Sequence, residues 1–527
     1  MALKRADQTI PTKPAAKKAN QLKAPALSEA KERFVAEPMV RENAFLSRRA
    51  QDGRLPDFSE ARRVLPNPVW DANPPAITAF WRAWETAFAN LRQPTPSNGF
   101  VSSYVSPAGE RCISMWDAVF TAQFGRYGNR AFPFQLALDN FYAKQLADGF
   151  IGGELRQLDG QSDWHRHSPY STGPEIFAWA EMDHFLNTGD FHRLKSVYSP
   201  LLALHRWMRK NRSWPNGSYW TTGHASAMEN MPRLSPGCDA ALEHGGMTWV
   251  DATFQAALTA KVLAQASVLL GRPEEETEEV RHEVISLTGW ANDHLWHGRK
   301  GFYFDLLAND ELSSVFHVGS FWGLLAGAVP PSRVEAFADN LSDPRRFSRH
   351  HRVPSLSAAE EGYEAEAGER WNGGVFPQTS YMVLRGLTQV GMDDMAFTIA
   401  RNHLGRVLDV FRDTGALWTY YSPESSQPGR NAEPDVAGGA CITPISVLIE
   451  YIFGLRPRDP LGNRLTWDIH LTDAFGIERY PLGPANEVSL FCERRSAPTD
   501  EPIVAIRATQ PTLVDIRWPG GGKTVRS

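Results

Sequence analysis

The sequence predicts a mainly helical fold, a toroid of helical hairpins followed by a small β-sandwich. Apolar residues recur with the 3.6-residue period of an α-helix from Pro75 to about Leu455. After Leu455 they alternate with polar residues, as in half-buried strands. No alternation of strands with helices appears, and no glycine-rich phosphate loop follows a strand. These observations argue against a doubly wound α/β fold.

Four apolar faces mark the predicted helices. The clearest has Thr443 as the expected N-cap and Pro444 as the first helical residue. Between the helices run uneven loops rich in Trp, Tyr, Gly, Pro and acids, which we expect at one open mouth. The faces are Phe134, Leu138 and Phe141; Phe254, Leu258, Val262 and Leu269, with Gly271 as the stop; Phe397, Ala400, Leu404, Val407, Leu408 and Phe411; and Ile445, Leu448, Ile449, Ile452 and Phe453.

The same patterns predict the domain organisation. Residues 1–34 are rich in Lys, Ala and Pro and are expected to be a disordered basic tail. Residues 35–74 should wrap the main domain, 75–455 form the helical catalytic-type domain, and 456–527 form the β-rich domain. The expected strand residues are Leu465, Trp467, Ile469 and Leu471; Val488, Leu490 and Cys492; Val504 and Ile506; and Val514, Ile516 and Trp518.

Composition excludes several classes of partner. A formal net charge of −5 and a pI near 6.3 give no reason to expect nucleic acid. We expect neither a membrane span nor a signal peptide. The four cysteines lack metal-ligand spacing, so we expect reduced thiols, a cytoplasmic location and no cofactor. Homo-oligomerisation is left open.

The stretch Trp214–Arg233 is the strongest functional signal. A Pro-Asn-Gly turn leads to a single carboxylate, Glu229, among Trp, Tyr, Asn and Arg residues. Aromatic faces stack on pyranose rings, and amide and guanidinium groups bind their hydroxyls. The alternative is a structural loop in which Glu229 pairs with Arg233.

Two further loops carry polar residues beside aromatic ones. Trp116 and Asp117 enter a helix, where Asp117 is either a helix cap or an acceptor for sugar hydroxyls. Asp163 and His165 lie in an Asp-Trp-His-Arg-His run and suggest a polar substrate rim. No third ligand has metal-site spacing, so no metal is expected.

Two later loops complete the predicted site. Trp371 and Asn372 precede a glycine pair that would let the backbone approach a ligand closely, or make a tight turn between helices. Trp418, Tyr420 and Glu424 lie on either side of a turn and suggest a second wall of a carbohydrate pocket. No serine-hydrolase elbow is present.

Taken together, these motifs resemble the (α/α)6-barrel glycosidases of the trehalase and family 63 clan, notably the bacterial mannosylglycerate and glucosylglycerate hydrolase-like branch. The similarity runs from about Pro66 to the C-terminus and implies this fold and glycosidase activity. Its markers are Met115-Trp116-Asp117, Asp139-Asn140-Phe141-Tyr142, Asp148-Gly149-Phe150, Gly217-Ser218-Tyr219-Trp220, Trp371-Asn372-Gly373-Gly374-Val375 and Trp418-Thr419-Tyr420-Tyr421-Ser422-Pro423.

The resemblance also implies an inverting mechanism with two carboxyl groups. The family's acid is an Asp in a Ser-Gly-x-Asp-Asn-x-Pro-Arg run, which matches Glu229 here, with Ala227 at the glycine position. We expect the pKa of this acid to be raised, with Arg233 turned toward substrate. The family's base position holds Thr419, which cannot activate water. Glu424 is therefore the expected base, with Glu433 and Asp435 further off.

Two functions follow. The first is a glycoside hydrolase for a small α-linked glycoside or oligosaccharide, with the predicted residues around one pocket. The second is a descendant of that fold that only binds saccharide or runs epimerase or lyase chemistry, because Thr419 occupies the base position. The residues expected to line the pocket are Trp116, Asp117, Arg233, Trp371, Asn372, Trp418 and Tyr420.

Overall fold

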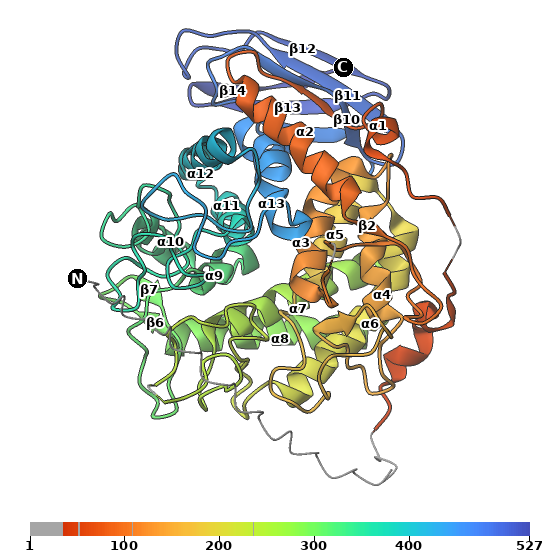
Figure 1. Cartoon of the computed structure of the whole chain (residues 1–527), viewed down its shortest axis with the longest axis vertical. Coiled ribbons are helices and arrows are strands. Elements are labelled where there is room, and N and C mark those ends of the chain that lie inside the picture. The colour runs from red at the N-terminus through yellow and green to blue at the C-terminus, as the bar shows by residue number, and fades with distance from the viewer. Residues whose placement is uncertain (1–34, 51–52, 108, 236) are drawn as a thin grey trace, which may run out of the picture. The chain divides into compact units, whose positions relative to one another are not determined.

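Among the residues that the computed structural model describes (35–50, 53–107, 109–235 and 237–527), six helices each contact the next in a closed series (Figure 1). They are α3 (Met115–Gly125), α5 (Phe177–Thr188), α7 (Val250–Leu270), α9 (Trp322–Ala326), α11 (Pro377–Gln389) and α13 (Ala437–Ala440), which contacts α3 again. The predicted tail, 1–34, falls outside the described residues.

A second group of helices packs on this series. Helices α6 (Phe191–Asn211) and α8 (Glu274–His294) contact α7, and α12 (Asp393–Thr414) contacts α11. Helix α2 (Pro74–Ala89) contacts the π-helix η7 (Thr443–Ile452). The shorter helices are α1 (Phe58–Ala61), α4 (Asp139–Tyr142), α10 (Pro331–Ala338), and the 3₁₀ segments η1 (Pro38–Glu42), η2 (Ala44–Ser47), η3 (Arg126–Gly128), η4 (Phe134–Leu138), η5 (Val318–Phe321) and η6 (Asp339–Leu341).

Most of the predicted helical faces are confirmed. The second face lies on α7, which ends at Gly271 with a left-handed φ of 62°, and the third lies on α12. The prediction of Thr443 as N-cap is wrong. Its hydroxyl bonds His403 Nε2 at 2.7 Å, and Thr443 is itself the first residue of η7, after Ile442. The first face falls on η4 and α4 rather than on one continuous helix.

Helix α7 has the length and hydropathy of a membrane span, but 67% of its apolar window is buried inside the protein. It contacts α5, α6, α8 and α9. We therefore interpret α7 as a core helix.

Two four-stranded sheets are formed by β1, which precedes the long helices, and by β8 to β14, which follow them. One has the order β1-β10-β11-β12 and is antiparallel throughout; the other has the order β14-β13-β9-β8, with β13 parallel to β9. The strands of these two sheets are β1 (Asn67–Val69), β8 (Leu455–Pro457), β9 (Arg464–Asp468), β10 (Phe475–Leu482), β11 (Asn486–Cys492), β12 (Val504–Ala508), β13 (Leu513–Trp518) and β14 (Gly521–Arg526). Three short two-stranded sheets pair β2 (Leu91–Arg92) with β3 (Tyr104–Val105), β4 (Cys112–Ser114) with β5 (Glu154–Arg156), and β6 (Trp296–His297) with β7 (Phe302–Tyr303).

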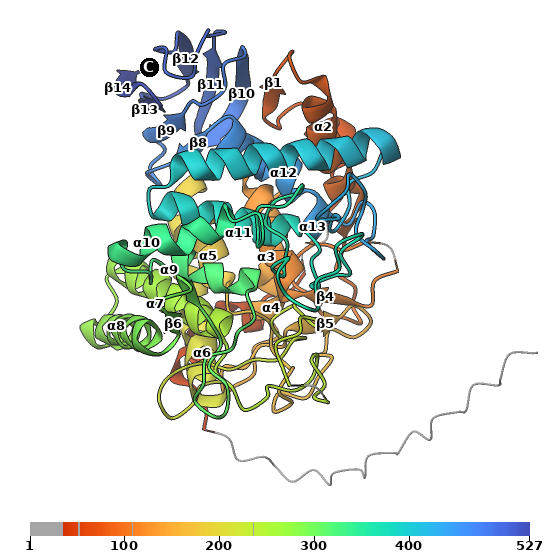
Figure 2. The same ribbon diagram turned by 90° about the vertical axis from the view of Figure 1, so that its left-hand side faces the viewer.

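The sheets share one core with the helices. Trp467 donates its indole N–H to the Phe453 carbonyl at 2.9 Å, and Phe453 packs on Phe475. Strand β1, from the segment predicted only to wrap the main domain, pairs with β10. In Figure 2, α12 lies between the sheets and α11. Residues 36–527 form one compact unit.

Candidate active site

A cavity of about 470 Å³ opens at the N-terminal end of α3. Residues of loops from most of the chain line it, and they fall within the segments 104–107, 110–118, 153–154, 172–174, 224–229, 370–378, 419–420 and 431–438 without filling each of them. Of the residues predicted from sequence, Trp116, Asp117, Glu229, Trp371 and Tyr420 line it. Thr419 lines it too.

Hydrogen bonds fix the loop that carries Glu229. Asn230 donates to the Glu369 carbonyl at 2.9 Å and accepts from the Trp371 N–H at 2.9 Å. These bonds tie the Glu229 loop to the next loop of the wall. The Glu229 carboxylate accepts from the Trp371 indole N–H at 3.0 Å and pairs with Arg370. The alternative partner considered for Glu229, Arg233, is therefore replaced by Arg370.

One backbone position in this loop is strained. Ala227 has a left-handed φ of 60°, a conformation that glycine adopts freely and alanine does not. The family run considered above has glycine there. The loop thus keeps a glycine conformation around an alanine side chain that lines the cavity.

Stacked aromatic rings form one wall of the cavity. Trp371 and Phe376 are nearly parallel, with ring centroids 3.7 Å apart, and Phe376 stacks on Tyr420 at 4.7 Å. Trp116 meets Trp371 edge-on at 6.2 Å. Such a wall offers an extended apolar face to a flat ligand surface such as a sugar ring.

The first turn of α3 brings Asp117 to the cavity. Ser114, not Asp117, is the N-cap, and its hydroxyl also donates to the Asp117 carboxylate at 2.9 Å. Helix α13 approaches closely because Gly438 has no side chain. The pKa of Asp117 is raised to about 6, chiefly because the surrounding protein excludes bulk water, although the side chain is exposed to the cavity.

Thr419 is hydrogen-bonded to the backbone of Glu433, which the sequence analysis considered a less favoured base than Glu424. The Thr419 hydroxyl accepts from the Glu433 N–H at 3.0 Å, and the Glu433 carbonyl accepts from the Thr419 N–H at 3.0 Å. Glu433 lines the cavity with an exposed side chain. The adjacent residues Trp418 and Pro434 form an antiparallel β-bridge, which extends the pairing of these two segments. The base position therefore has a glutamate on the adjacent strand-like segment.

Two more carboxylates line the cavity. Glu154 lies 3.6 Å from His224, and this contact lowers the pKa of Glu154 and raises that of His224. The pKa of Glu110 is raised, first by desolvation and then by the charges of Glu433 and Glu154. Sequence reasoning missed Glu110 and Glu154, which lie in none of the motifs considered, and it assigned no role to His224 within the stretch Trp214–Arg233.

Two predicted roles are contradicted. Arg233 does not face the cavity; it is buried, bidentate to both Asp251 and Asp305 at 2.6–2.9 Å, and packed on Trp249. Glu424 does not line the cavity either. It accepts from Arg349 at 2.6 Å and from the Tyr363 hydroxyl at 2.7 Å. The predicted base is thus already paired elsewhere.

Four other predicted residues also lie outside the cavity lining. The Trp418 indole donates to Thr414 at 3.1 Å, and the Asn372 carbonyl accepts from the backbone N–H of Glu364. His165 packs against His167. Asp163 pairs with Arg111 at 2.5 Å. A predicted pocket of seven residues therefore keeps Trp116, Asp117, Trp371 and Tyr420.

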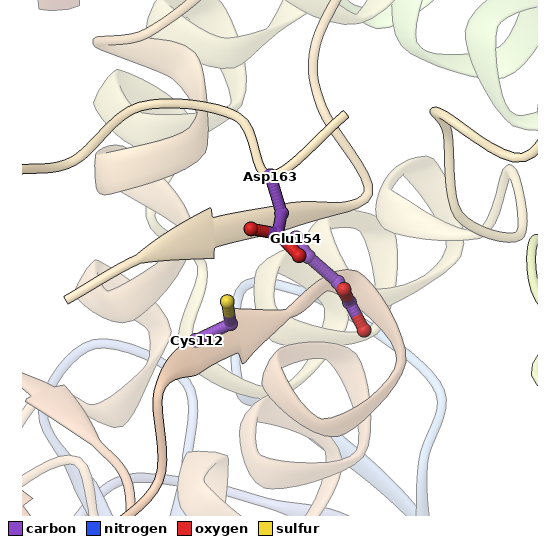
Figure 3. Close-up of side chains that lie close together, drawn as sticks. All are labelled: Cys112, Glu154 and Asp163. Carbon is purple, nitrogen blue, oxygen red and sulfur yellow. The ribbon is translucent and has the colours of Figure 1, made fainter. Parts of the chain in front are cut away.

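Asp163 instead joins a small group beside the cavity. Ligand atoms of Cys112, Glu154 and Asp163 lie within 4.8 Å of one another (Figure 3). Both carboxylates already have basic partners, since Glu154 contacts His224 and Asp163 pairs with Arg111. Burial raises the pKa of the Cys112 thiol to about 11, which disfavours the thiolate that binds metals. Side chains therefore already balance the charge of this group.

A comparison with protein families assigns the chain. The profile of the mannosylglycerate hydrolase MGH1-like glycoside hydrolase domain matches residues 112–434, more than half of the chain. The chain belongs to this family. The matched segment contains most of the residues that line the cavity. The lining residues outside it lie between Tyr104 and Glu110 and between Val436 and Gly438.

Individual relatives agree with this family. An uncharacterised protein of Borreliella burgdorferi is 24% identical over 398 residues, covering 73% of this chain and 81% of that protein. The GH63 mannosylglycerate hydrolase of Thermus thermophilus, solved with glucose, aligns with a TM-score of 0.57 at 18% identity over 70% of this chain and 99% of its own. The neutral trehalase of Saccharomyces cerevisiae aligns with a TM-score of 0.53 at 11% identity, over 68% of this chain and 76% of its own.

The MGH1-like family and these fold similarities confirm the resemblance to the trehalase and family 63 clan. At these identities the solved structures show the fold alone. The role of each residue in the cavity must be argued from its own geometry.

Proposed function

We propose that this chain hydrolyses a small α-linked glycoside with inversion, inside an (α/α)6 barrel. The closed series of six helices and the second group packed on it support the barrel. The observation that carries the activity is that Glu229, at the family's acid position, and Glu433, paired with the family's base position, line one cavity with an aromatic wall. Inverting glycosidases need two carboxyl groups ~6.5–9.5 Å apart.

Glu229 is the proposed general acid. In the free protein its carboxylate is held by Arg370 and by the Trp371 indole. The Arg370 side chain is 55% exposed, so a bound sugar can displace it at low cost. Substrate binding would then leave Glu229 shielded by aromatic rings and able to hold the proton that the leaving oxygen receives.

Glu433 is the proposed base in place of Glu424. Its backbone is fixed to Thr419 by two hydrogen bonds and both residues line the cavity, which supports Glu433 as the base near the position from which the family activates water. No ion pair with Glu433 occurs within the described part of the chain. An unpaired carboxylate at the cavity surface is free to bind and deprotonate a water molecule.

The substrate should not carry an anionic aglycone. The relative from Thermus thermophilus is named a mannosylglycerate hydrolase, and glycerate has a carboxylate. The two basic side chains in the lining of this cavity, Arg370 and His224, already contact Glu229 and Glu154. A glycerate group would therefore meet carboxylates rather than a free cation.

Carboxylate variants test the assignment. We expect Glu229→Gln and Glu433→Gln each to lower kcat on cleaved α-glycosides by about 10²–10⁴-fold, because each removes one proton-transfer group. Binding of sugar, measured by calorimetry, should change much less. Proton NMR of the first-formed anomer should show inversion.

Glu424→Gln is the matched control, since Glu424 lies outside the cavity lining and pairs with Arg349. It should keep near-native kcat. Azide should restore part of the rate of Glu433→Gln by replacing the activated water, and should not restore Glu229→Gln. Full activity of Glu433→Gln would contradict the assignment of the base.

The second candidate, a saccharide-binding protein without hydrolysis, is favoured by one observation. The Thr419 hydroxyl is used to fix the backbone of Glu433 and cannot replace a carboxylate base. Cleavage of no glycoside, together with measurable sugar binding, would select this function. For either function we propose a cytoplasmic location, supported by four cysteines that are all free thiols.

A further inference from the structure

Aromatic side chains at the surface continue from the rim of the cavity. His224 lines the cavity, and its side chain is 28% exposed. The ring of Trp164 lies 5.7 Å from the ring of His224, and Tyr170 meets Trp164 edge-on at 4.8 Å. Trp164 and Tyr170 are half-buried, so each keeps part of its ring at the surface. The aromatic surface of the site therefore extends beyond the cavity into the loop between β5 and α5.

A second group of rings lies in the loop between α6 and α7. Trp214 and Trp220 are half-buried, and their ring centroids are 6.0 Å apart. His244 packs 4.7 Å from Trp220 and 5.6 Å from Trp214. The backbone N–H of His224 donates to the Ala241 carbonyl at 2.8 Å. This bond places the segment that leads to His244 against the rim of the cavity.

One buried arginine joins the two groups of rings. Arg212 is 3% exposed, and its guanidinium lies 4.9 Å from the centre of the Trp220 ring. The same guanidinium donates to the Ser168 carbonyl at 2.7 Å and to the Ser171 hydroxyl at 2.9 Å, in the loop that carries the first group. Burial lowers the pKa of Arg212 to about 10. Arg212 therefore acts inside the protein, where it fixes the two loops relative to each other.

The rings of both groups form one surface, which we call the aromatic ledge. Half-exposed Trp and Tyr side chains combine an apolar face with a polar edge, and pyranose rings stack on such faces. The ledge begins at His224, a residue of the cavity lining, and the cavity has an aromatic wall of its own. This continuity favours a saccharide over a protein partner, because one extended sugar chain would contact both surfaces. The ledge consists of Trp164, Tyr170, Trp214, Trp220 and His244.

We propose that the aromatic ledge binds further sugar units of an α-linked oligosaccharide whose terminal unit occupies the cavity. The inference rests on the proposed function, because it names the aglycone of the same reaction: further sugar units rather than a small non-sugar group. A neutral sugar aglycone also agrees with the lining of the cavity, whose two basic side chains already contact carboxylates.

The test measures binding of sugars of increasing length by calorimetry. The full chain carries Glu229→Gln, so that the sugars stay intact. The probes are maltose to maltopentaose, isomaltose to isomaltopentaose, and the α-linked mannobiose to mannopentaose. In at least one series we expect the tetrasaccharide to bind about ten-fold or more tightly than the disaccharide, because the added rings gain aromatic faces. Unchanged affinity beyond the disaccharide, or no binding, in every series would overturn the proposal.

Variants locate the effect on the ledge. Trp164→Ala and Trp220→Ala should each weaken binding of the tetrasaccharide by about three- to ten-fold and that of the disaccharide by less, because each removes one stacking face. Trp290→Ala is the matched control. Trp290 is also half-buried and stacks on a histidine, His294, at 4.6 Å, but it lies on α8 outside the cavity lining. This control should leave both affinities unchanged.

The difference between the two lengths separates a binding role from a structural one. Equal loss of affinity for the disaccharide and the tetrasaccharide in both ledge variants would show damage to the cavity and overturn the assignment. An undiminished gain with length in both variants would overturn it as well.

Hydrolysis of the same sugars by the native chain separates this inference from the proposed function. Cleavage with a kcat/KM that does not rise with length would refute the role of the ledge and leave the hydrolase proposal standing. Tighter binding of longer sugars without cleavage of any glycoside would support the ledge and refute the hydrolase proposal.

Discussion

At the scale of single residues, the loop that carries Glu229 shows how a site keeps a backbone after its sequence changes. Ala227 has the left-handed φ of 60° that suits the glycine of the family run. The neighbouring contacts of Asn230 with Glu369 and Trp371 hold the loop in place. The tertiary structure therefore imposes a conformation that the local sequence disfavours.

This strain gives a stability prediction. Ala227→Gly should raise the free energy of unfolding by about 0.5–1 kcal/mol, because glycine adopts φ near +60° without steric cost. Urea unfolding followed by circular dichroism measures the change. The same substitution at Ala336, exposed within α10, should lower stability by about 1 kcal/mol, since glycine weakens a helix interior. A loss of stability in Ala227→Gly would show that the loop is not strained.

Arg233 gives a second prediction at this scale. Arg233→Met should destabilise the protein by about 3–5 kcal/mol, because Asp251 and Asp305 would remain buried without their cation. Chemical denaturation measures this loss. Arg349→Met, which breaks the half-exposed pair with Glu424, is the comparison and should cost about 1 kcal/mol or less. Similar small effects for both would contradict the structural role of Arg233.

At the scale of elements, a chain of buried polar groups joins α12 to η7. His351 Nε2 and His403 Nδ1 are 2.7 Å apart, and His403 Nε2 bonds the Thr443 hydroxyl. Both histidines are completely buried, and burial lowers the pKa of His403 to about 3 and that of His351 well below its ordinary value. Both are therefore neutral in the folded protein.

These histidines predict a dependence of stability on pH. Their pKa values are lower in the folded state than the ordinary value near 6.5, so their contribution is complete above pH 6.5 and is lost as pH falls toward 3. Each histidine should add up to ~1.4 kcal/mol per pH unit to the slope in this range. Unfolding by urea between pH 7 and pH 4 measures it. His403→Gln, which cannot titrate, should flatten the slope; an unchanged slope would assign it to other groups.

At the scale of the whole molecule, the helices and the sheets belong to one compact unit. Strand β1 precedes the first long helix and pairs with β10, while Trp467 and Phe475 pack against Phe453 at the end of η7. Residues 75–455, predicted from the change of period to be a domain, lack both partners. The period of a segment reports its local structure, and it does not report which surfaces the segment covers.

Truncation tests this dependence. A chain of residues 75–455 should be insoluble or unfold without a cooperative transition, because removal of the sheets exposes the apolar face around Phe453. The full chain should show a single cooperative transition by calorimetry. A monodisperse fragment with a sharp thermal transition would contradict this expectation.

The sequence by itself determined the helical class, the existence of α7 and α12 with the Gly271 stop of α7, and the family, because these depend on local periodicity and on contiguous motifs. It placed Trp116, Asp117, Glu229, Trp371 and Tyr420 in the cavity lining for the same reason. It missed β14, whose alternating residues are mostly exposed and polar.

Only the tertiary structure decided the electrostatic partners. Glu229 pairs with Arg370 rather than with Arg233, and Glu424 forms an ion pair with Arg349. The pairing of Glu433 with Thr419 joins residues that no repeat or spacing connects. Ion pairs and hydrogen bonds act over a few ångströms between segments far apart in the chain, so their partners are set by how the loops meet around the cavity.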